Sequence, residues 1–474
     1  MKLRSLHRSH LPMNPVIGGL FAIHTSIYSL VNLLFSYKLC EKETKTSCLE
    51  TAFNESSNYS LNRTDADTLT LYFRITEMAI ALVPCLYFAS WSDKHGRKPC
   101  FLVPFSGSIL RDLGLIIATN VIDMEPSWVL IAAVPSGFTG SYILFVIAAF
   151  CRVSDTTDHR SRTYHFGMLI GSCTLGIAVG TLIGCHWRSL IPLHLFKIVC
   201  TSVFTLSICI HVTLIILVVL FMDETVQQLG DFDGSCWRGI IAPSNLAGCL
   251  NAVFKKRTHN FRFFILILLF AFIIGRIAFY GEMAMMSKYY STNFSWTEET
   301  SMVFESVNAL LQAIVVVLIV ATARSFYFED ASLGIVGSFG ITLSSLLQAL
   351  SPSLILAILA FFARSLALLV PTATLSLLSK LADTREYGSL FGSFWALELL
   401  LPTVSTIISK GIFQASLPDY PEQIFLFLVF LTSITLLVFL YVRRNLHPEL
   451  LGHIESTERI PLVEQLDIVK GEIF

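Results

Sequence analysis

Long apolar runs alternate with short polar connections over most of the chain. A helix needs about 20 apolar residues to cross the hydrocarbon core of a bilayer, and twelve runs are long enough. After the first connection, the longest polar segment covers residues 222–262 and divides the runs into two sets of six. We predict membrane-spanning helices over residues 15–37, 69–90, 99–121, 128–150, 165–186, 194–221, 263–287, 300–323, 331–350, 354–378, 388–410 and 423–442.

This pattern predicts an all-α membrane protein with twelve transmembrane helices in two six-helix bundles. Its expected parts are an N-terminus (1–14), a first bundle (15–221, with an outer loop at 38–68), a linker (222–262), a second bundle (263–442) and a tail (443–474). Within the linker, "APSNLAGCLNAVF" predicts a short helix. In the seventh run, Gly275 and Gly281 would allow the helix to break.

The distribution of basic residues predicts the orientation. Lysine and arginine gather in the connections that lie on the same side as the two chain ends, and such connections face the cytosol. The first outer loop also holds Cys40 and Cys48, which could form a local disulfide outside the cytosol. Four acceptor triplets for N-glycosylation fall on the predicted outer face, beginning at Asn54, Asn58, Asn62 and Asn293.

Composition agrees with a membrane protein and argues against other classes. Of the 474 residues, 54% are hydrophobic and 14% are charged, whereas soluble domains carry about 25% charged residues. The net charge of −1 gives no indication of a nucleic-acid partner. The sequence lacks the common zinc-protease, P-loop, dinucleotide-binding and serine-hydrolase motifs, and no cysteine pair has metal-ligand spacing. We therefore expect no enzyme activity, no metal and no cofactor.

The connection between the second and third runs, "SWSDKHGRKP", is densely charged. Asp93 and Arg97 are four residues apart and can pair, Gly96 permits a positive φ angle, and Lys98 adds a charge. The stretch resembles the signature between helices 2 and 3 of the major facilitator superfamily. Ala89 stands where glycine is usual, and Lys94 replaces an arginine.

The resemblance implies a secondary transporter with an inner gate. Two six-helix halves around a central binding site are typical of such transporters. In this interpretation Asp93, Gly96, Arg97 and Lys98 form a latch that holds the inner gate shut while the site faces outward. The alternative is a positively charged turn on the inner side that has no role in gating.

Three further stretches sharpen the resemblance. "RVSDTTDHRSRT" (152–163), "GCHW" (184–187) and "LLSKL" (377–381) are similar to loops of the proton-coupled folate and haem carriers, the solute carrier 46-like family. The family implies transport of an organic anion, with the proton as coupling ion. Ile170 and Leu375, however, stand where folate-carrying members have a glutamate and an arginine, so folate itself is not the expected substrate.

Ionisable residues inside spans are costly and are functional candidates. Arg74 and Glu77 lie three apart on one helix face and could form an intramembrane pair. Arg111 and Asp112 are adjacent, so we expect them to need separate partners. The candidates for binding substrate or protons are Arg111, Asp112, Arg276, Tyr280, Glu282, Glu305, Arg364 and Glu398.

The three arginines among these candidates would offer fixed positive charge to a carboxylate. One or more of the four carboxylates would take up a proton, because burial in a low dielectric favours the neutral form. The alternative for each residue is a structural ion pair between helices.

The sequence as a whole predicts a secondary active transporter that moves a small organic anion by alternating access. The alternative is a non-transporting receptor or scaffold that keeps the fold. We expect the protein in the plasma membrane with both termini in the cytosol. Lysosomal or endosomal membranes are the alternative, because "PELLG" and "ERIPLV" in the tail approximate the acidic dileucine pattern that clathrin adaptors read.

Overall fold

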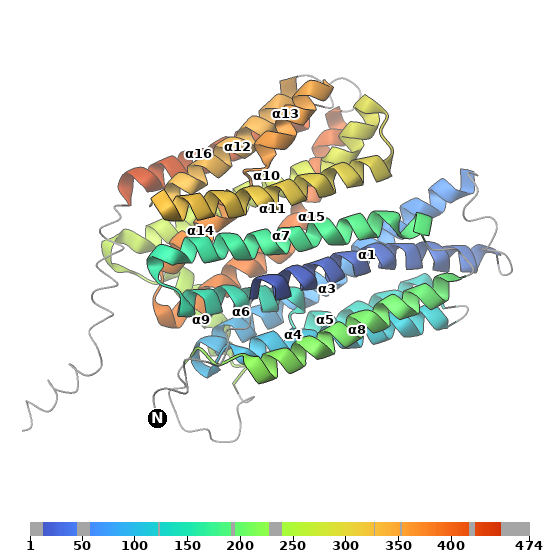
Figure 1. The fold of residues 1–474 in the computed structure, drawn as a ribbon, viewed down its shortest axis with the longest axis horizontal. Coiled ribbons are helices and arrows are strands. Elements are labelled where there is room, and N and C mark those ends of the chain that lie inside the picture. The colour runs from blue at the N-terminus through green and yellow to red at the C-terminus, as the bar shows by residue number, and fades with distance from the viewer. Residues whose placement is uncertain are drawn as a thin grey trace, which may run out of the picture.

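The computed structural model describes residues 13–44, 57–121, 124–190, 195–226, 239–326, 328–350, 353–416 and 422–446. Within these ranges, twelve helical segments are long and apolar enough to cross a membrane. They run side by side along the long axis of the molecule (Figure 1). The chain is an all-α membrane protein of two six-helix bundles, as predicted.

In the described residues of the first bundle and the linker, the structure forms nine helices. They are α1 (Met13–Thr44), α3 (Ser57–His95), α4 (Lys98–Asn120), η1 (Pro126–Ala132), α5 (Ala133–Phe138), α6 (Ser141–Thr156), α7 (His159–Leu190), α8 (Phe196–Phe221) and the linker helix α9 (Pro243–Phe254).

The second bundle follows. Its helices are α10 (Phe261–Phe294), α11 (Glu298–Phe326), α12 (Asp330–Leu350), α13 (Leu354–Arg364), α14 (Leu369–Leu381), α15 (Tyr387–Ser416) and α16 (Gln423–Asn445), with short turns η3 (Thr258–Asn260) and η4 (Thr384–Glu386).

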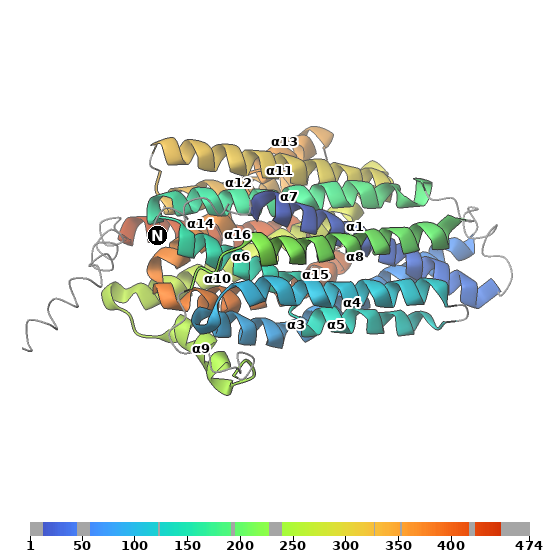
Figure 2. The same cartoon turned by 60° about the horizontal axis from the view of Figure 1, so that its bottom comes forward.

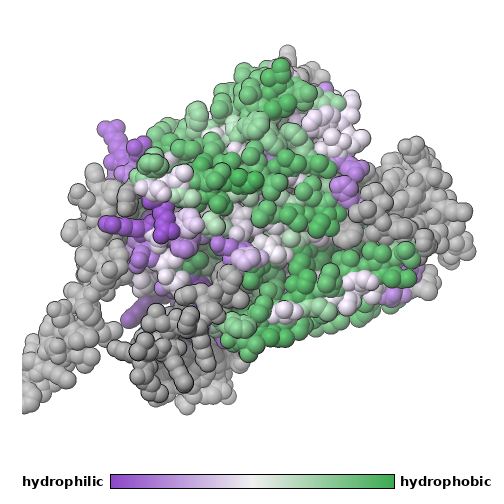
Figure 3. Space-filling model, in the orientation of Figure 1, coloured by the Kyte–Doolittle hydropathy of each residue, from purple (hydrophilic) through white to green (hydrophobic). Residues whose placement is uncertain are grey.

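On the face that Figure 3 shows, the middle of the molecule is largely apolar, and hydrophilic residues gather towards its ends. Along the helices, large side chains such as Ile117, Ile198 and Phe430 are more than half exposed. In water such exposure would oppose folding, so these surfaces fit a lipid environment. The buried faces of the same helices form the core.

The two bundles meet along α7 and α11, which lie side by side in both ribbon views (Figures 1 and 2). Glycines on α7 permit this approach. A Cβ atom on Gly167 would meet the Val320 side chain at 2.6 Å, and one on Gly171 would meet Val317 at 2.9 Å. These two glycines therefore bring one bundle against the other.

The predicted break in the seventh span is wrong, because α10 is continuous through Gly275 and Gly281. Gly281 instead gives room to α15: a Cβ atom there would meet the Ser409 hydroxyl at 2.5 Å. The tenth predicted span is interrupted instead, after Arg364 at the end of α13, and the fourth is interrupted between α5 and α6. Close packing therefore explains Gly281 better than flexibility does.

The predicted linker helix forms as α9 and packs against both bundles. The Cys249 thiol donates to the carbonyl of Leu86 on α3 (3.3 Å), and the Ser393 hydroxyl on α15 donates to the carbonyl of Cys249 (3.1 Å). The linker helix thus touches α3 and α15 at the end of the molecule where α3 meets α4.

Several sequence predictions concern the first outer loop. Helix α1 extends to Thr44 and α3 begins at Ser57, so the Asn58 and Asn62 triplets fall on the first turns of α3. Asn54 and Cys48 lie outside the described residues. Cys40 is disulfide-bonded, and its pairing with Cys48 stays a prediction. Asn293 lies near the end of α10. Glycosylation at all four asparagines and the orientation of the chain in the membrane also stay predictions.

Candidate functional site

The turn between α3 and α4 depends on Gly96. Its φ of 112° lies in the region that glycine tolerates best, and a Cβ atom there would meet the Glu224 carboxylate at 2.5 Å. That carboxylate accepts hydrogen bonds from the backbone N–H groups of Arg97 (2.7 Å) and Lys98 (3.0 Å). Glu224 therefore caps the N-terminus of α4, where a negative charge is favoured.

We call the end of the molecule that carries this turn the gate end. Here Arg97 is buried and pairs with Asp93 (2.8 Å) and with Asp155 on α6 (3.1 Å). The predicted Asp93–Arg97 pair is therefore present. Lys98 lies apart from it, because its ammonium donates to the carbonyl of Val219 on α8 (2.9 Å), within the same bundle.

Asp93 also joins the two bundles. Its carboxylate accepts hydrogen bonds from the backbone N–H groups of Gly388 (2.7 Å) and Ser389 (2.8 Å) and from the Ser389 hydroxyl (2.7 Å). These residues form the first turn of α15, so the carboxylate lies at a helix N-terminus that favours negative charge. The latch predicted from the sequence thus bonds across the bundle interface.

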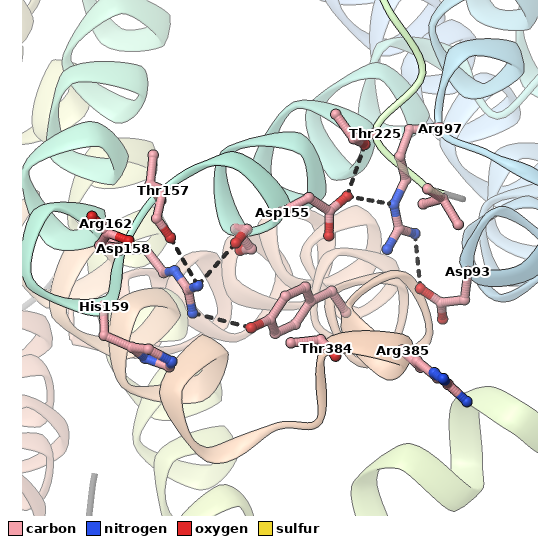
Figure 4. Close-up of a pocket in the computed structure, with 13 residues that line it drawn as sticks. Asp93, Arg97, Asp155, Thr157, Asp158, His159, Arg162, Thr225, Thr384 and Arg385 are labelled. Carbon is pink, nitrogen blue, oxygen red and sulfur yellow. Dashed lines mark hydrogen bonds and ion pairs between the residues drawn. The ribbon is translucent and has the colours of Figure 1, made fainter. Parts of the chain in front are cut away.

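A cavity of about 400 Å³ opens beside this latch (Figure 4). It is lined by both bundles. The first contributes Asp93, Arg97, Ser154, Asp155, Thr157, Asp158, His159 and Arg162, the stretch after α8 contributes Thr225 and Val226, and the second bundle contributes Thr384, Arg385 and Tyr387. The cavity is polar and lies at the seam of the gate end.

Arg162 forms a second bond across the seam, which the sequence analysis missed. Its guanidinium donates to the carbonyl of Ser379 and to the hydroxyl of Tyr387, both at 3.1 Å. It also donates to the carbonyls of Ser154 and Thr157 at the end of α6. The only sequence signal was its place in the "RVSDTTDHRSRT" loop, which we interpreted as part of the resemblance to the folate and haem carriers.

Asp330, at the start of α12, forms a third contact that was not predicted. Its carboxylate accepts hydrogen bonds from Thr163 of the first bundle (2.6 Å) and from Ser376 (2.8 Å) and Lys380 (2.6 Å) of the second. The gate end is therefore closed by three separate polar contacts between the bundles. In this state the bundles are locked together at the end that carries Gly96.

A polar cluster is buried in the middle of the first bundle, around Arg111. The guanidinium contacts Asp112 (2.9 Å), His24 on α1 (3.2 Å) and, at 3.8 Å, Glu77 on α3. The expectation that Arg111 and Asp112 need separate partners is therefore wrong, because the long arginine side chain folds back onto its neighbour. Asp112 also accepts a hydrogen bond from Ser207 on α8 (2.6 Å).

The predicted Arg74–Glu77 pair is also wrong. Glu77 is buried, and besides Arg111 it accepts hydrogen bonds from Tyr28, from Ser136 (2.5 Å) and from Ser141 (2.7 Å). The guanidinium of Arg74 instead lies 4.6 Å above the ring of Tyr28. Spacing along one helix placed the two residues near each other, but Glu77 turns towards neighbouring helices that complete its hydrogen bonds.

The second bundle holds two more buried clusters. Arg276 on α10 pairs with Glu398 on α15 and donates to Tyr280 on its own helix, which also donates to Glu398. Arg364 pairs with Glu305 on α11 (3.0 Å) and lies 3.7 Å from Glu282 on α10.

Glu282 is completely buried in the Arg364 cluster. It accepts hydrogen bonds from Ser344 (3.0 Å) and Gln348 (3.1 Å) on α12. The eight candidate residues thus gather into three clusters, one in the first bundle and two in the second. Each of the three candidate arginines already has a carboxylate partner.

Ile170 and Leu375 are buried in the main apolar core, at 7% and 1% exposure. Apolar side chains suit these positions, because an unpaired charge there would be costly. Among the residues that the structure describes, no group of acidic, histidine and cysteine side chains could hold a metal ion.

No protein-family model matches the chain. A Drosophila melanogaster protein, described as a probable peptidoglycan muropeptide transporter SLC46, is 23% identical over 382 residues, covering 79% of this chain and 72% of the relative. The Homo sapiens lysosomal proton-coupled steroid conjugate and bile acid symporter SLC46A3 is 25% identical over 420 residues, covering 84% of both chains. Both relatives are transporters rather than enzymes.

Solved structures share the fold. The human organic anion transporter MFSD10 superimposes with a TM-score of 0.67 at 15% identity, covering 90% of this chain and 98% of that one. The major facilitator transporter FucP in the outward conformation gives a TM-score of 0.60 at 10% identity, covering 92% and 99%. At such identities the likeness concerns the arrangement of helices alone.

Proposed function

We propose that this chain, a secondary transporter of the major facilitator superfamily with an SLC46-like sequence, carries a small organic anion by proton-coupled alternating access. The observation that carries the proposal is the bonding of Asp93 to the first turn of α15 across the bundle interface. Such bonds can be exchanged for bonds to water when the bundles tilt. A closed gate end corresponds to a substrate site that is open towards the other side.

The ionisable clusters support proton coupling. Two carboxylates, Glu282 and Glu305, share the single guanidinium of Arg364. With all three groups ionised the cluster would carry one net negative charge in a buried place, and one proton would neutralise it. One carboxylate oxygen of Glu282 has no hydrogen-bond partner among the described residues, so a proton there would break no existing bond.

Uptake measurements test the proposal. Cells that express the chain would be offered a panel of labelled organic anions in mildly acidic and in neutral buffer. We expect saturable uptake that rises with an inward proton gradient. In Glu282→Gln this dependence should disappear, because the variant cannot exchange a proton at that position. Glu299→Gln, an exposed residue of α11, is the matched control and should behave as the wild type.

The alternative, a receptor or scaffold with the same fold, makes a different prediction. It would bind an anion saturably but would show no uptake above that of cells lacking the protein. Anion uptake that does not change with the proton gradient would contradict proton coupling but would still support anion transport.

For location we propose the plasma membrane, with both termini in the cytosol. The lysosomal alternative draws support from the SLC46A3 relatives, which are described as lysosomal, and from the dileucine-like patterns of the tail, where clathrin adaptors would bind. Surface labelling of a tagged chain, with and without residues 447–474, decides between them. Retention of the full chain in lysosomes and its release to the surface on truncation would overturn the plasma-membrane proposal.

A further inference from the structure

On helix α3, Arg74 lies on the side opposite an exposed apolar stripe. Tyr72, Ala79 and Val83 form an exposed apolar stripe. At about 100° per residue, Arg74 lies on the opposite side of the helix, roughly 180° from Val83. Arg74 is nevertheless exposed. Its guanidinium is therefore open to water on the side of α3 that lies opposite the apolar stripe.

Aromatic side chains from α1 and α6 form a wall beside this arginine. The ring of Tyr28 lies under its guanidinium. The His24 ring packs against both Tyr28 and Tyr142, with centroids 4.6 and 4.3 Å apart, and Phe21 contacts Tyr142 at 5.3 Å. A positive charge thus lies at the edge of an apolar aromatic surface.

The wall lies at the interface between the two bundles. Helix α6, which carries Tyr142, touches α15 of the second bundle, because the ring of Phe150 lies 5.5 Å from the ring of Trp395. Helix α3, which carries Arg74, bonds to the same helix through Asp93 and Ser389 (2.8 Å). Helices α3 and α6 therefore border the region between the bundles, where a substrate must pass from one side to the other.

Arg74 also differs from the other arginines of the span interior because it has no carboxylate partner among the described residues. Arg111, Arg276 and Arg364 are each neutralised by at least one carboxylate. Within the described ranges, Arg74 has no ion pair and no hydrogen bond. A charged guanidinium whose N–H groups are open to solvent can bind an oxyanion through two parallel hydrogen bonds.

We propose that Arg74, which lies over the buried ring of Tyr28, binds the oxyanion group of an amphipathic substrate whose apolar part packs against the half-buried rings of Tyr142 and Phe21. The proposal rests on the proposed function and names the residue that recognises the charge. It also assigns the three arginines predicted from the sequence to structural or proton-linked pairs rather than to the substrate. Carboxylates and sulfonates share this chemistry, and both would be accepted.

Equilibrium binding to the purified chain tests the assignment. The probes are naphthalene-1-acetate, naphthalene-1-sulfonate and the neutral naphthalene-1-acetamide, followed by their fluorescence. We expect the wild type to bind both anions more tightly than the amide. Arg74→Gln should weaken anion binding about ten- to hundredfold, as for loss of a charged hydrogen bond, and should leave amide binding unchanged. Arg74→Lys should recover part of the loss.

A matched control separates recognition from stability. Arg324 is another exposed arginine that lies over a tyrosine ring, 5.0 Å from Tyr164, so Arg324→Gln removes the same kind of contact at the gate end. It should leave anion binding unchanged. If Arg74 were only a structural partner of Tyr28, Arg74→Gln would lower the melting temperature and would weaken amide and anion binding alike.

The outcomes separate the role of Arg74 from the proposed transport of an organic anion. Anion binding that is unchanged in Arg74→Gln would overturn the assignment of this residue and leave anion transport standing. A wild type that binds the amide as tightly as the anions, or that binds none of the probes, would count against an amphipathic anion as substrate and would remove the proposed function together with the role of Arg74.

Discussion

Arg162, at the start of α7, donates a hydrogen bond of 3.1 Å to the hydroxyl of Tyr387, at the start of α15 and 225 positions further along the chain. The same guanidinium reaches the carbonyl of Ser379 at the end of α14. These bonds connect the two bundles beside the cavity of Figure 4. Arg162 therefore bonds the two bundles to each other at the gate end, as Asp93 does.

Replacing Arg162 should loosen the gate end. Hydrogen bonds of charged groups contribute about 1.5–3 kcal/mol each, so Arg162→Gln should shift the balance towards an open gate end by a factor of about ten or more. Distances between spin labels on α6 and α14 would report the shift. Arg160→Gln, an exposed neighbour, is the control. An unchanged distance distribution in Arg162→Gln would contradict a role in closure.

Gly388→Ala should hold the bundles apart. The added Cβ atom would meet the carbonyl oxygen of Ala89 at 2.2 Å, and inserting a methyl into a tight contact costs about 1–3 kcal/mol. We expect the open gate end to gain population and uptake to fall. Gly411→Ala on the same helix meets nothing within 4 Å and should be silent. Equal effects of the two substitutions would point to helix propensity instead.

The Arg276–Glu398 pair should show strong coupling in thermal unfolding of the purified chain. Removing one member of a buried pair leaves an unpaired charge and costs about 3–5 kcal/mol. Arg276→Gln and Glu398→Gln should each lower the melting temperature, and the double variant should recover much of the loss because no charge is left alone. Additive losses would show that the two side chains act independently.

Lys255, which follows the linker helix, should contribute little to the stability of the fold. Its contribution should not depend on pH near neutrality. Hydrogen bonds from its ammonium to Glu386 and then Asp383 raise the pKa of Lys255. A lysine whose pKa is higher in the folded state gives its full stabilisation at pH values below its pKa in the unfolded state, about 10.4. This stabilisation is lost only as the pH rises through the pKa of the folded state.

Lys255→Gln therefore tests the exposed linker contact. Because the pair is partly exposed, we expect a loss of stability under about 1 kcal/mol that is the same from about pH 6 to 9 and smaller at high salt. Unfolding curves at several pH values measure it. A loss that grows or shrinks strongly within that pH window would indicate a different titrating group.

Much of the architecture was predictable from the order of residues. Twelve spans follow from the lengths of apolar runs, because crossing a bilayer needs a fixed length of helix regardless of its neighbours. The latch turn was predictable for a similar reason. Asp93, Gly96 and Arg97 lie within five residues of one another. Local backbone geometry therefore sets their relative positions, which can be inferred from the spacing.

Partner choice in the interior was not predictable, because it depends on which helices touch. Glu77 contacts Arg111 rather than Arg74. Gly281 allows α10 to pack closely against α15 and does not break α10. Arg162 becomes a gate contact only when α7 meets α14 and α15. A single sequence shows that a buried charge needs a partner. Which arginine of the spans has no carboxylate partner among the described residues depends on contacts between helices far apart in the chain.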